Sequence, residues 1–182
     1  ILKKLSLKVF PGECAGILGP NGCGKTTLFS MCIGEQSIDN GKIILNNKSI
    51  EKIPIHERAK EGLGYLPQQR SVFNMSVYEN ILGIAQISIK DSEKQKNITE
   101  KLLDEFNLQH LRSLNASVLS GGEISRLTMA RVMIRKPKIV LLDEPLAALD
   151  PLIIQDIQKY ILKIQSNGTA VLVTDHNVKN LF

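Results

Sequence analysis

The nine-residue segment GPNGCGKTT narrows the folds open to this chain more than any other part of it. It matches the pattern G-x-x-x-x-G-K-[ST] in full and lies between an apolar run and a helical stretch, which is the setting that the pattern requires. The glycines let the backbone wrap around phosphate groups, Lys25 reaches the outer phosphates, and the Thr26 hydroxyl can ligate Mg²⁺. The candidate phosphate-binding residues are Gly19, Pro20, Asn21, Gly22, Cys23, Gly24, Lys25, Thr26 and Thr27.

Three short apolar runs, at 14–19, 138–144 and 169–175, each end in a glycine or a carboxylate. Runs of this kind are typical of strands buried on both faces of a parallel sheet. The carboxyl ends of such strands meet at one edge, where ligands bind. At the end of the second run, Asp143 is placed to hold Mg²⁺, and Glu144 can polarise a water for attack on a γ-phosphate. Acidic residues often end strands, so this pair alone is weak evidence for a nucleotide site. Together with a phosphate loop it is strong evidence.

The rest of the chain divides by its periodicity. Residues 5–13 alternate apolar and polar side chains, and 41–50 reads as two short strands around Asn46-Asn47. Together these segments predict an antiparallel flap. From about 76 to 136 the apolar residues recur at helical spacing. We therefore expect a single domain over 1–182, with a helical subdomain at about 76–136.

A second glycine-rich segment, LSGGEISR, begins at Leu119. Ser120 and Glu123 have the spacing of a capping box, and Gly121 and Gly122 leave backbone N–H groups uncovered at a helix N-terminus. Such a helix start favours an anion, so the sequence predicts two phosphate sites in one chain.

The charge and cysteine content favour a reduced, soluble setting. The formal net charge is +5, but the basic residues are scattered among acidic ones, which argues against a nucleic-acid partner. Cys14, Cys23 and Cys32 lack metal-ligand spacing and are expected to be free thiols. We find no apolar run long enough to cross a bilayer and no signal peptide, so the sequence predicts a cytoplasmic protein without a membrane span of its own.

Six motifs in order resemble those of the ATP-binding-cassette (ABC) ATPases. They are GPNGCGKTT, YLPQ with Gln68, LSGGE, LLDEP, ALD with Asp150, and TDH with His176. Singly, Gln68 could be a polar loop residue, Asp150 a helix N-cap and His176 a surface histidine. The resemblance implies an α/β fold of the P-loop NTPase, ABC ATPase type. That fold combines a mainly parallel sheet core with an antiparallel β flap and an inserted helical subdomain.

The resemblance also implies how such a chain works. ATP and Mg²⁺ are the implied cofactors, with Gln68 in the metal and water network, His176 at the γ-phosphate and Asp150 at a dimer seam. Family members form head-to-tail homodimers in which Ser120, Gly121 and Gly122 of one subunit would face the ATP of the other. Transmembrane permease subunits would dock near Val72 and Phe73.

Within the family, the chain is most similar to the ATPases of lipopolysaccharide exporters, in segments such as GYLPQQRSVFNMSVYENI. The ATPases of branched-chain amino-acid importers are the alternative, and soluble ABC ATPases that act on nucleic acid or ribosomes fit less well. Ile124-Ser125 departs from the more basic pair expected after LSGGE. The resemblance implies a peripheral location on the cytoplasmic face of the inner membrane. It also suggests a chain truncated at both ends, with the adenine contact upstream of residue 1 and a helix begun after His176.

Overall fold

A computed structural model describes residues 2 and 4–176 of the chain. Its main sheet has four parallel strands in the order β1-β6-β5-β4, and a separate antiparallel pair joins β2 to β3. The strands are β1 (Cys14–Leu18), β2 (Ile44–Leu45), β3 (Lys48–Ser49), β4 (Leu63–Leu66), β5 (Ile139–Asp143) and β6 (Ala170–Asp175). The predicted parallel α/β fold is confirmed.

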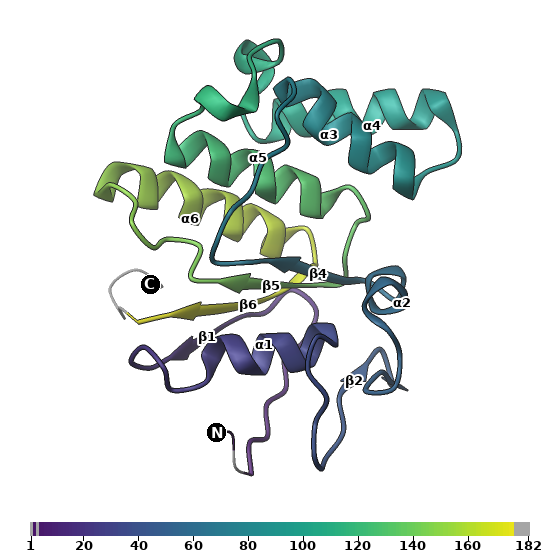
Figure 1. The fold of residues 1–182 in the computed structure, drawn as a ribbon, viewed down its shortest axis with the longest axis vertical. Coiled ribbons are helices and arrows are strands. Elements are labelled where there is room, and N and C mark those ends of the chain that lie inside the picture. Colours follow the sequence, from purple (N-terminus) through teal and green to yellow (C-terminus); the bar gives the residue numbers. More distant parts are fainter. Residues whose placement is uncertain (1, 3, 177–182) are drawn as a thin grey trace.

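Helices cover both faces of the main sheet (Figure 1). The α-helices are α1 (Lys25–Ile33), α2 (Ile55–Lys60), α3 (Val77–Ser88), α4 (Ser92–Glu105), α5 (Gly121–Met133) and α6 (Pro151–Ser166). Two 3₁₀ turns, Gln109–Leu111 and Ala116–Val118, lie between α4 and α5. In Figure 1, α1 lies on one face, α5 and α6 lie on the other, and α3 and α4 pack beyond α5. The region 76–136 is therefore helical, as its periodicity predicts.

The core is divided by the sheet into two clusters. Leu141 and Leu172 face α1 and pack with Phe29 and Ile33. The alternate strand residues point the other way, into the larger cluster beneath α5 and α6; they are Val140, Leu142, Val171 and Val173. This alternation is the period of two that a strand imposes, so the same two strands contribute side chains to both clusters.

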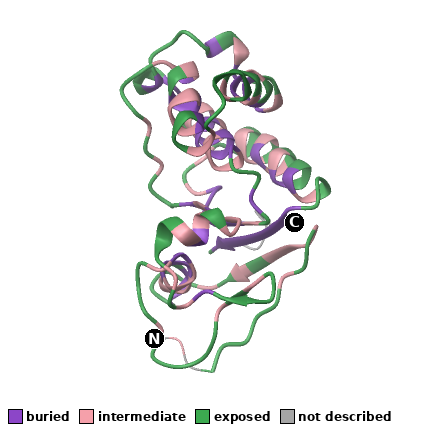
Figure 2. Ribbon diagram, turned by 90° about the vertical axis from the view of Figure 1, so that its right-hand side faces the viewer, coloured by how far each residue is buried: buried purple, intermediate pink, exposed green. Residues whose placement is uncertain are grey.

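The structure corrects the strand prediction in three places. Residues 5–10 form no strand, and Leu5 and Leu7 are exposed. Among the described residues no strand lies in register beside this segment, and a strand needs such a partner. The first apolar run, β1, is only partly buried because β6 is its sole partner in the described sheet. Figure 2 shows β6 buried throughout and β1 partly exposed. We also find one strand that the apolar runs do not reveal, β4.

The predicted hairpin at 41–50 forms over β2 and β3 alone. Asn46 and Asn47 both have positive φ, 49° and 62°, which is the turn geometry that favours asparagine between two short strands. No helix in the described part of the chain is long and apolar enough to cross a membrane. The helix expected after His176 lies outside the described residues.

Candidate active site

The carboxyl ends of the four parallel strands bring the predicted motifs to one edge of the sheet. Leu18 of β1 pairs with Asp175 of β6, and Asp143 of β5 pairs with Thr174 of β6. The phosphate loop begins directly after β1, Glu144 follows Asp143 at the end of β5, and His176 follows β6. The strand β4 ends at Leu66 and leads into Gln68 at the same edge, because it also runs parallel to β5.

Lys25 lies buried at the first turn of α1, with its ammonium directed at the phosphate loop. Its Nζ donates to the carbonyl oxygens of Gly19 at 2.7 Å and Pro20 at 3.2 Å. The same nitrogen is 3.5 Å from Glu144 Oε1. Gly24, which precedes the helix, has φ 106°, a conformation that glycine adopts without strain. The loop therefore carries a positive charge at a helix N-terminus, which favours a phosphate group.

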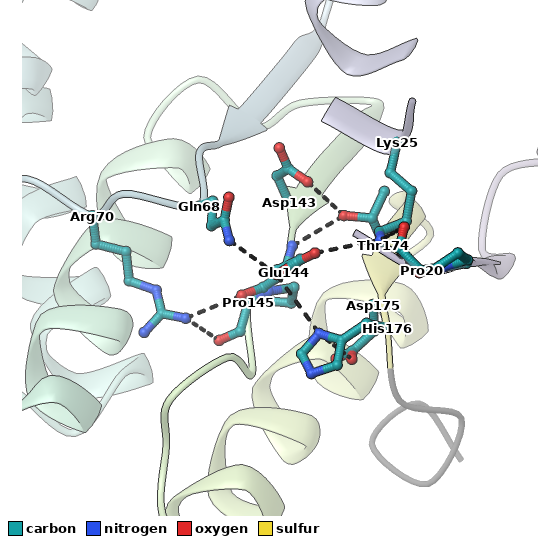
Figure 3. Close-up of polar contacts among 11 residues, drawn as sticks. Pro20, Lys25, Gln68, Arg70, Asp143, Glu144, Pro145, Thr174, Asp175 and His176 are labelled. Atoms are coloured by element: carbon teal, nitrogen blue, oxygen red, sulfur yellow. Dashed lines mark hydrogen bonds and ion pairs between the residues drawn. The ribbon is translucent and has the colours of Figure 1, made fainter. Parts of the chain in front are cut away.

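Glu144 is the point at which the site residues meet (Figure 3). Gln68 Nε2 donates to Glu144 Oε2 at 2.9 Å, and His176 Nδ1 lies 3.8 Å from the same oxygen. The backbone of Glu144 has φ 46°, which is uncommon for a residue with a side chain. Its N–H donates to the backbone oxygen of Thr174 at 3.2 Å and to Thr174 Oγ1 at 3.0 Å. The strained conformation is thus held by the neighbouring strand, as strained site residues usually are.

Asp143 is buried behind Glu144. Its Oδ1 accepts a hydrogen bond of 2.6 Å from Thr174 Oγ1, whereas Oδ2 has no hydrogen-bond partner among the described residues. Nearby, burial and then the negative charge of Asp143 raise the pKa of Tyr65 to about 12. The phenol is therefore neutral at physiological pH, and the free carboxylate oxygen is available to a cation.

Arg70 joins this site, although nothing in its sequence pattern indicates it. Its Nη2 donates to the backbone oxygens of Glu144 and Pro145 (Figure 3). Its Nη1 donates to Ser125 Oγ at 2.7 Å. Burial lowers the pKa of Arg70 from its usual value. The only available signal was its position two residues after Gln68, and position alone does not identify a partner.

The predicted capping box at the second glycine-rich segment is present. Glu123 N donates to Ser120 Oγ, and the Glu123 carboxylate accepts from Ser120 N at 2.7 Å. The pKa of Glu123 is lowered mainly by the hydrogen bond from the Ser120 hydroxyl. This segment begins α5, on the face of the sheet opposite α1, so it does not join the phosphate loop of its own chain (Figure 1).

The two glycines of that segment differ in their surroundings. A Cβ on Gly122 would lie 2.8 Å from Ile153 Cγ2 of α6, so packing within the chain excludes a side chain there. A Cβ on Gly121 would meet only Leu149 Cδ2, at an ordinary 3.5 Å. Packing within the chain therefore explains the glycine at 122 but does not explain the glycine at 121.

The remaining predicted residues have mixed surroundings. Asp150 is the N-cap residue of α6, but its side chain makes no capping hydrogen bond. Phe73 is 44% exposed, and the Arg131 guanidinium lies over its ring, 4.3 Å from the ring centroid. Val72 packs against the larger core cluster. The three cysteines are free, as expected.

Comparisons with known proteins agree with this geometry. A protein-family model described as ABC transporter matches residues 2–147. The chain belongs to the ABC transporter family. The ABC ATPase fold that the motifs predict is confirmed, and with it nucleotide binding and ATP hydrolysis as the family activity.

Named ABC relatives match nearly the whole chain. The lipopolysaccharide export system ATP-binding protein LptB of Haemophilus influenzae is 42% identical over 182 residues, which cover 98% of this chain and 75% of the relative. LptB of Acidithiobacillus ferridurans is 43% identical, with the same coverage. Among solved structures, the ADP conformation of MJ1267, an ATP-binding cassette of an ABC transporter, has a TM-score of 0.86 and 28% identity, and covers 97% of this chain and 75% of that one.

Proposed function

We propose that this chain is the ATP-hydrolysing subunit of an ABC transporter that exports lipopolysaccharide. The observation that carries the enzymatic part is the convergence of Lys25, Gln68 and His176 on the buried carboxylate of Glu144. The substrate follows from the similarity to LptB proteins, at 42% identity over nearly the full chain.

In the proposed reaction, Glu144 is the base that orients and deprotonates the attacking water. Lys25 and the backbone N–H groups of residues 19–27 bind the phosphates, so Lys25 must exchange its loop carbonyl partners for phosphate oxygens. His176, 47% exposed, is close enough to Glu144 to reach the γ-phosphate on the same side. Residues on four adjacent strand ends therefore surround the bond that breaks.

The residues present fit a magnesium ion. Asp143 Oδ2 is buried without a hydrogen-bond partner among the described residues, and Gln68 uses its Nε2 on Glu144, which leaves Oε1 as an acceptor. Thr26 would add its hydroxyl from α1. In the described part of the chain no group of three His, Cys, Asp or Glu residues could hold a metal by itself, and Mg²⁺ usually takes only one or two carboxylates beside substrate phosphates. When bound, Mg²⁺ would offset the charge of the β- and γ-phosphates.

The second phosphate site belongs to a partner subunit in this proposal. Gly121 has no packing reason within its own chain to lack a side chain, and the N-terminus of α5 lies away from the chain's own loop. Ser120, Gly121 and Gly122 of one subunit would therefore close on the ATP of the other, with Asp150 at the seam. This arrangement is that of a homodimer.

The membrane partner would contact the segment after Gln68. Phe73 and Met75 are exposed large apolar residues of this segment, and Val72 lies beside Phe73 with its side chain partly buried. Because the same segment begins at Gln68, which bonds to Glu144, docking of a permease there could reach the catalytic carboxylate directly. The chain would then act peripherally, on the cytoplasmic face of the inner membrane.

Transport by a reconstituted complex tests this function. The full-length protein would be purified with its membrane subunits, placed in vesicles that contain lipopolysaccharide, and assayed for ATP-dependent release of lipopolysaccharide to an acceptor. We expect release with the wild type and none with Lys25→Ala, which lacks the phosphate-binding ammonium. ATP hydrolysis without lipopolysaccharide release, in a complex that retains all its membrane subunits, would contradict the proposed substrate.

A further inference from the structure

We propose that Arg70 is a positioning residue that couples the start of α5 to the backbone of Glu144. This inference rests on the proposed function, because it concerns the same catalytic carboxylate. Arg70 lies in the loop that follows β4 and reaches two other elements at once. One side of its guanidinium contacts the residues that follow β5, and the other contacts α5.

The first contact acts on a strained backbone. Glu144 has φ 46°, and such a conformation persists only when its surroundings hold it. Thr174 holds the N–H of Glu144, and Arg70 Nη2 binds the carbonyl oxygens of Glu144, at 3.4 Å, and of Pro145. The peptide groups on both sides of the Glu144 Cα are thus fixed. The direction of the carboxylate follows from that conformation.

The second contact reaches the start of α5. Arg70 Nη1 donates to Ser125 Oγ at 2.7 Å, and Ser125 Oγ in turn donates to the carbonyl oxygen of Gly121 at 2.8 Å. Gly121 is the first residue of α5 and the glycine at which an added Cβ would meet only Leu149 Cδ2, at 3.5 Å. A continuous line of hydrogen bonds therefore runs from Gly121 through Ser125 and Arg70 to Glu144.

The guanidinium also contacts the place where the chain departs from the family pattern, at Ile124-Ser125. ABC ATPases are expected to carry a more basic pair directly after LSGGE, and here a serine occupies the position that faces the site. Arg70 supplies the positive charge to this place from a different element, the loop after β4. Arginine suits the task because its planar group offers donors in two directions, whereas lysine presents a single charge point.

The contacts of Arg70 are specific for a guanidinium, and its burial makes their loss costly. The side chain is partly buried, and its Nε has no hydrogen-bond partner among the described residues, so all its bonding is through the two terminal nitrogens. Both terminal nitrogens are committed, one to α5 and one to the Glu144 segment. A lysine ammonium places its donors at one point, so it does not reproduce the separate positions of the two terminal guanidinium nitrogens.

The test uses full-length protein with its membrane subunits. We expect Arg70→Lys to lower kcat for ATP about tenfold, because small misplacements of a catalytic group cost up to about 10²-fold. KM for ATP should change less than about threefold, since a group that acts only on the transition state leaves substrate binding intact. Arg135→Lys is the matched control: Arg135 Nε donates to Ser88 Oγ at 3.0 Å on the exposed surface, so the same exchange removes an Arg–Ser contact outside the site.

An arginine introduced on α5 in place of Arg70 tests whether the guanidinium positions Glu144 or only stabilises the fold. Arg70→Ala should be at least as impaired as Arg70→Lys, and adding Ser125→Arg should restore part of kcat by returning a guanidinium from α5. Melting temperatures are measured for every variant. Loss of kcat in folded Arg70→Lys, with partial rescue in the double variant, supports the inference.

Three results would overturn it. They are a kcat of Arg70→Lys equal to that of Arg135→Lys, a defect confined to KM, and a loss of activity no greater than the loss of folded protein. The proposed function is judged separately, by whether wild type hydrolyses ATP and Glu144→Gln does not. Active wild type, inactive Glu144→Gln and unaffected Arg70 variants would therefore refute the role of Arg70 alone.

Discussion

At the scale of single residues, Thr174 supports the proposed catalytic pair, Asp143 and Glu144, from the neighbouring strand. Its hydroxyl donates to Asp143 Oδ1 at 2.6 Å and accepts from Glu144 N at 3.0 Å, and its side chain is fully buried. One hydroxyl thus serves as both donor and acceptor for two adjacent acidic residues. Asp143 and Glu144 depend on β6 for their orientation, although they belong to β5 and the loop after it.

Thr174→Val keeps the shape of the side chain and removes the two hydrogen bonds of its hydroxyl, to Asp143 Oδ1 and from Glu144 N. We expect the free energy of unfolding to fall by about 1–3 kcal/mol, since a buried carboxylate loses its donor. ATP turnover should fall as well. Thr99→Val is the control, because Thr99 is equally buried and donates to Gln95 O within α4, far from the site in sequence and fold. Equal turnover of the two valine variants, measured with equal folded fractions, would refute a role for Thr174 in catalysis.

The residues that sequence analysis predicted are those tied to local patterns. Asp143 and Glu144 end an apolar run, and Lys25 belongs to the glycine-rich segment that follows another run, so local patterns find them without knowledge of the fold. Arg70 and Thr174 act through partners 75 and 31 residues away along the chain, and no local pattern encodes such a contact.

At the scale of elements, the two glycines that begin α5 differ in whether packing within the chain explains them. Gly122 is required by the close approach of α6, through Ile153, whereas Gly121 is not required by any neighbour in its own chain. A glycine required by packing also explains why the sequence pattern did not predict the strand β4. Its Gly64 gives the run GLGYL the composition of a turn, yet a Cβ there would lie 2.8 Å from Val132 Cγ1 of α5. Close packing of a helix, which the sequence pattern does not reveal, explains this glycine.

Alanine at the two positions should therefore have opposite effects. Gly122→Ala should lower the free energy of unfolding by about 1–3 kcal/mol, because the new methyl group overpacks the contact with α6. Gly121→Ala should leave it unchanged or raise it by up to about 1 kcal/mol, since alanine suits a helix better than glycine. Thermal unfolding of both variants provides the comparison. Destabilisation by Gly121→Ala equal to that by Gly122→Ala would contradict the distinction.

At the scale of the whole molecule, the proposed dimer shares each site between two chains. Lys25→Ala would damage a chain's own phosphate loop, and Gly121→Asp would place a carboxylate against the partner's γ-phosphate. In a heterodimer of these two variants, one composite site is intact and the other carries both defects. We expect mixing of the two inactive proteins to restore up to about half the wild-type turnover per dimer if the sites are independent.

The control for that experiment is a double variant with both substitutions, paired with wild-type protein. Shared sites then leave no intact site in the heterodimer, so its turnover should be much lower than that of the two single variants mixed. Full activity at one site of the control pair would contradict sharing between chains. The heterodimers must be isolated first, because residual wild-type homodimer would mask the difference.

The central claim is that Glu144 activates water in a nucleotide site formed by this chain, and single-turnover hydrolysis of ATP by Glu144→Gln tests it most directly. Glutamine keeps the size of the side chain and removes the charge, so the Lys25 loop should still bind ATP with near wild-type affinity. Hydrolysis should fall by about 10²-fold or more, the usual scale for loss of a positioned base. A Glu144→Gln protein that binds ATP and hydrolyses it at a near wild-type rate would contradict the account.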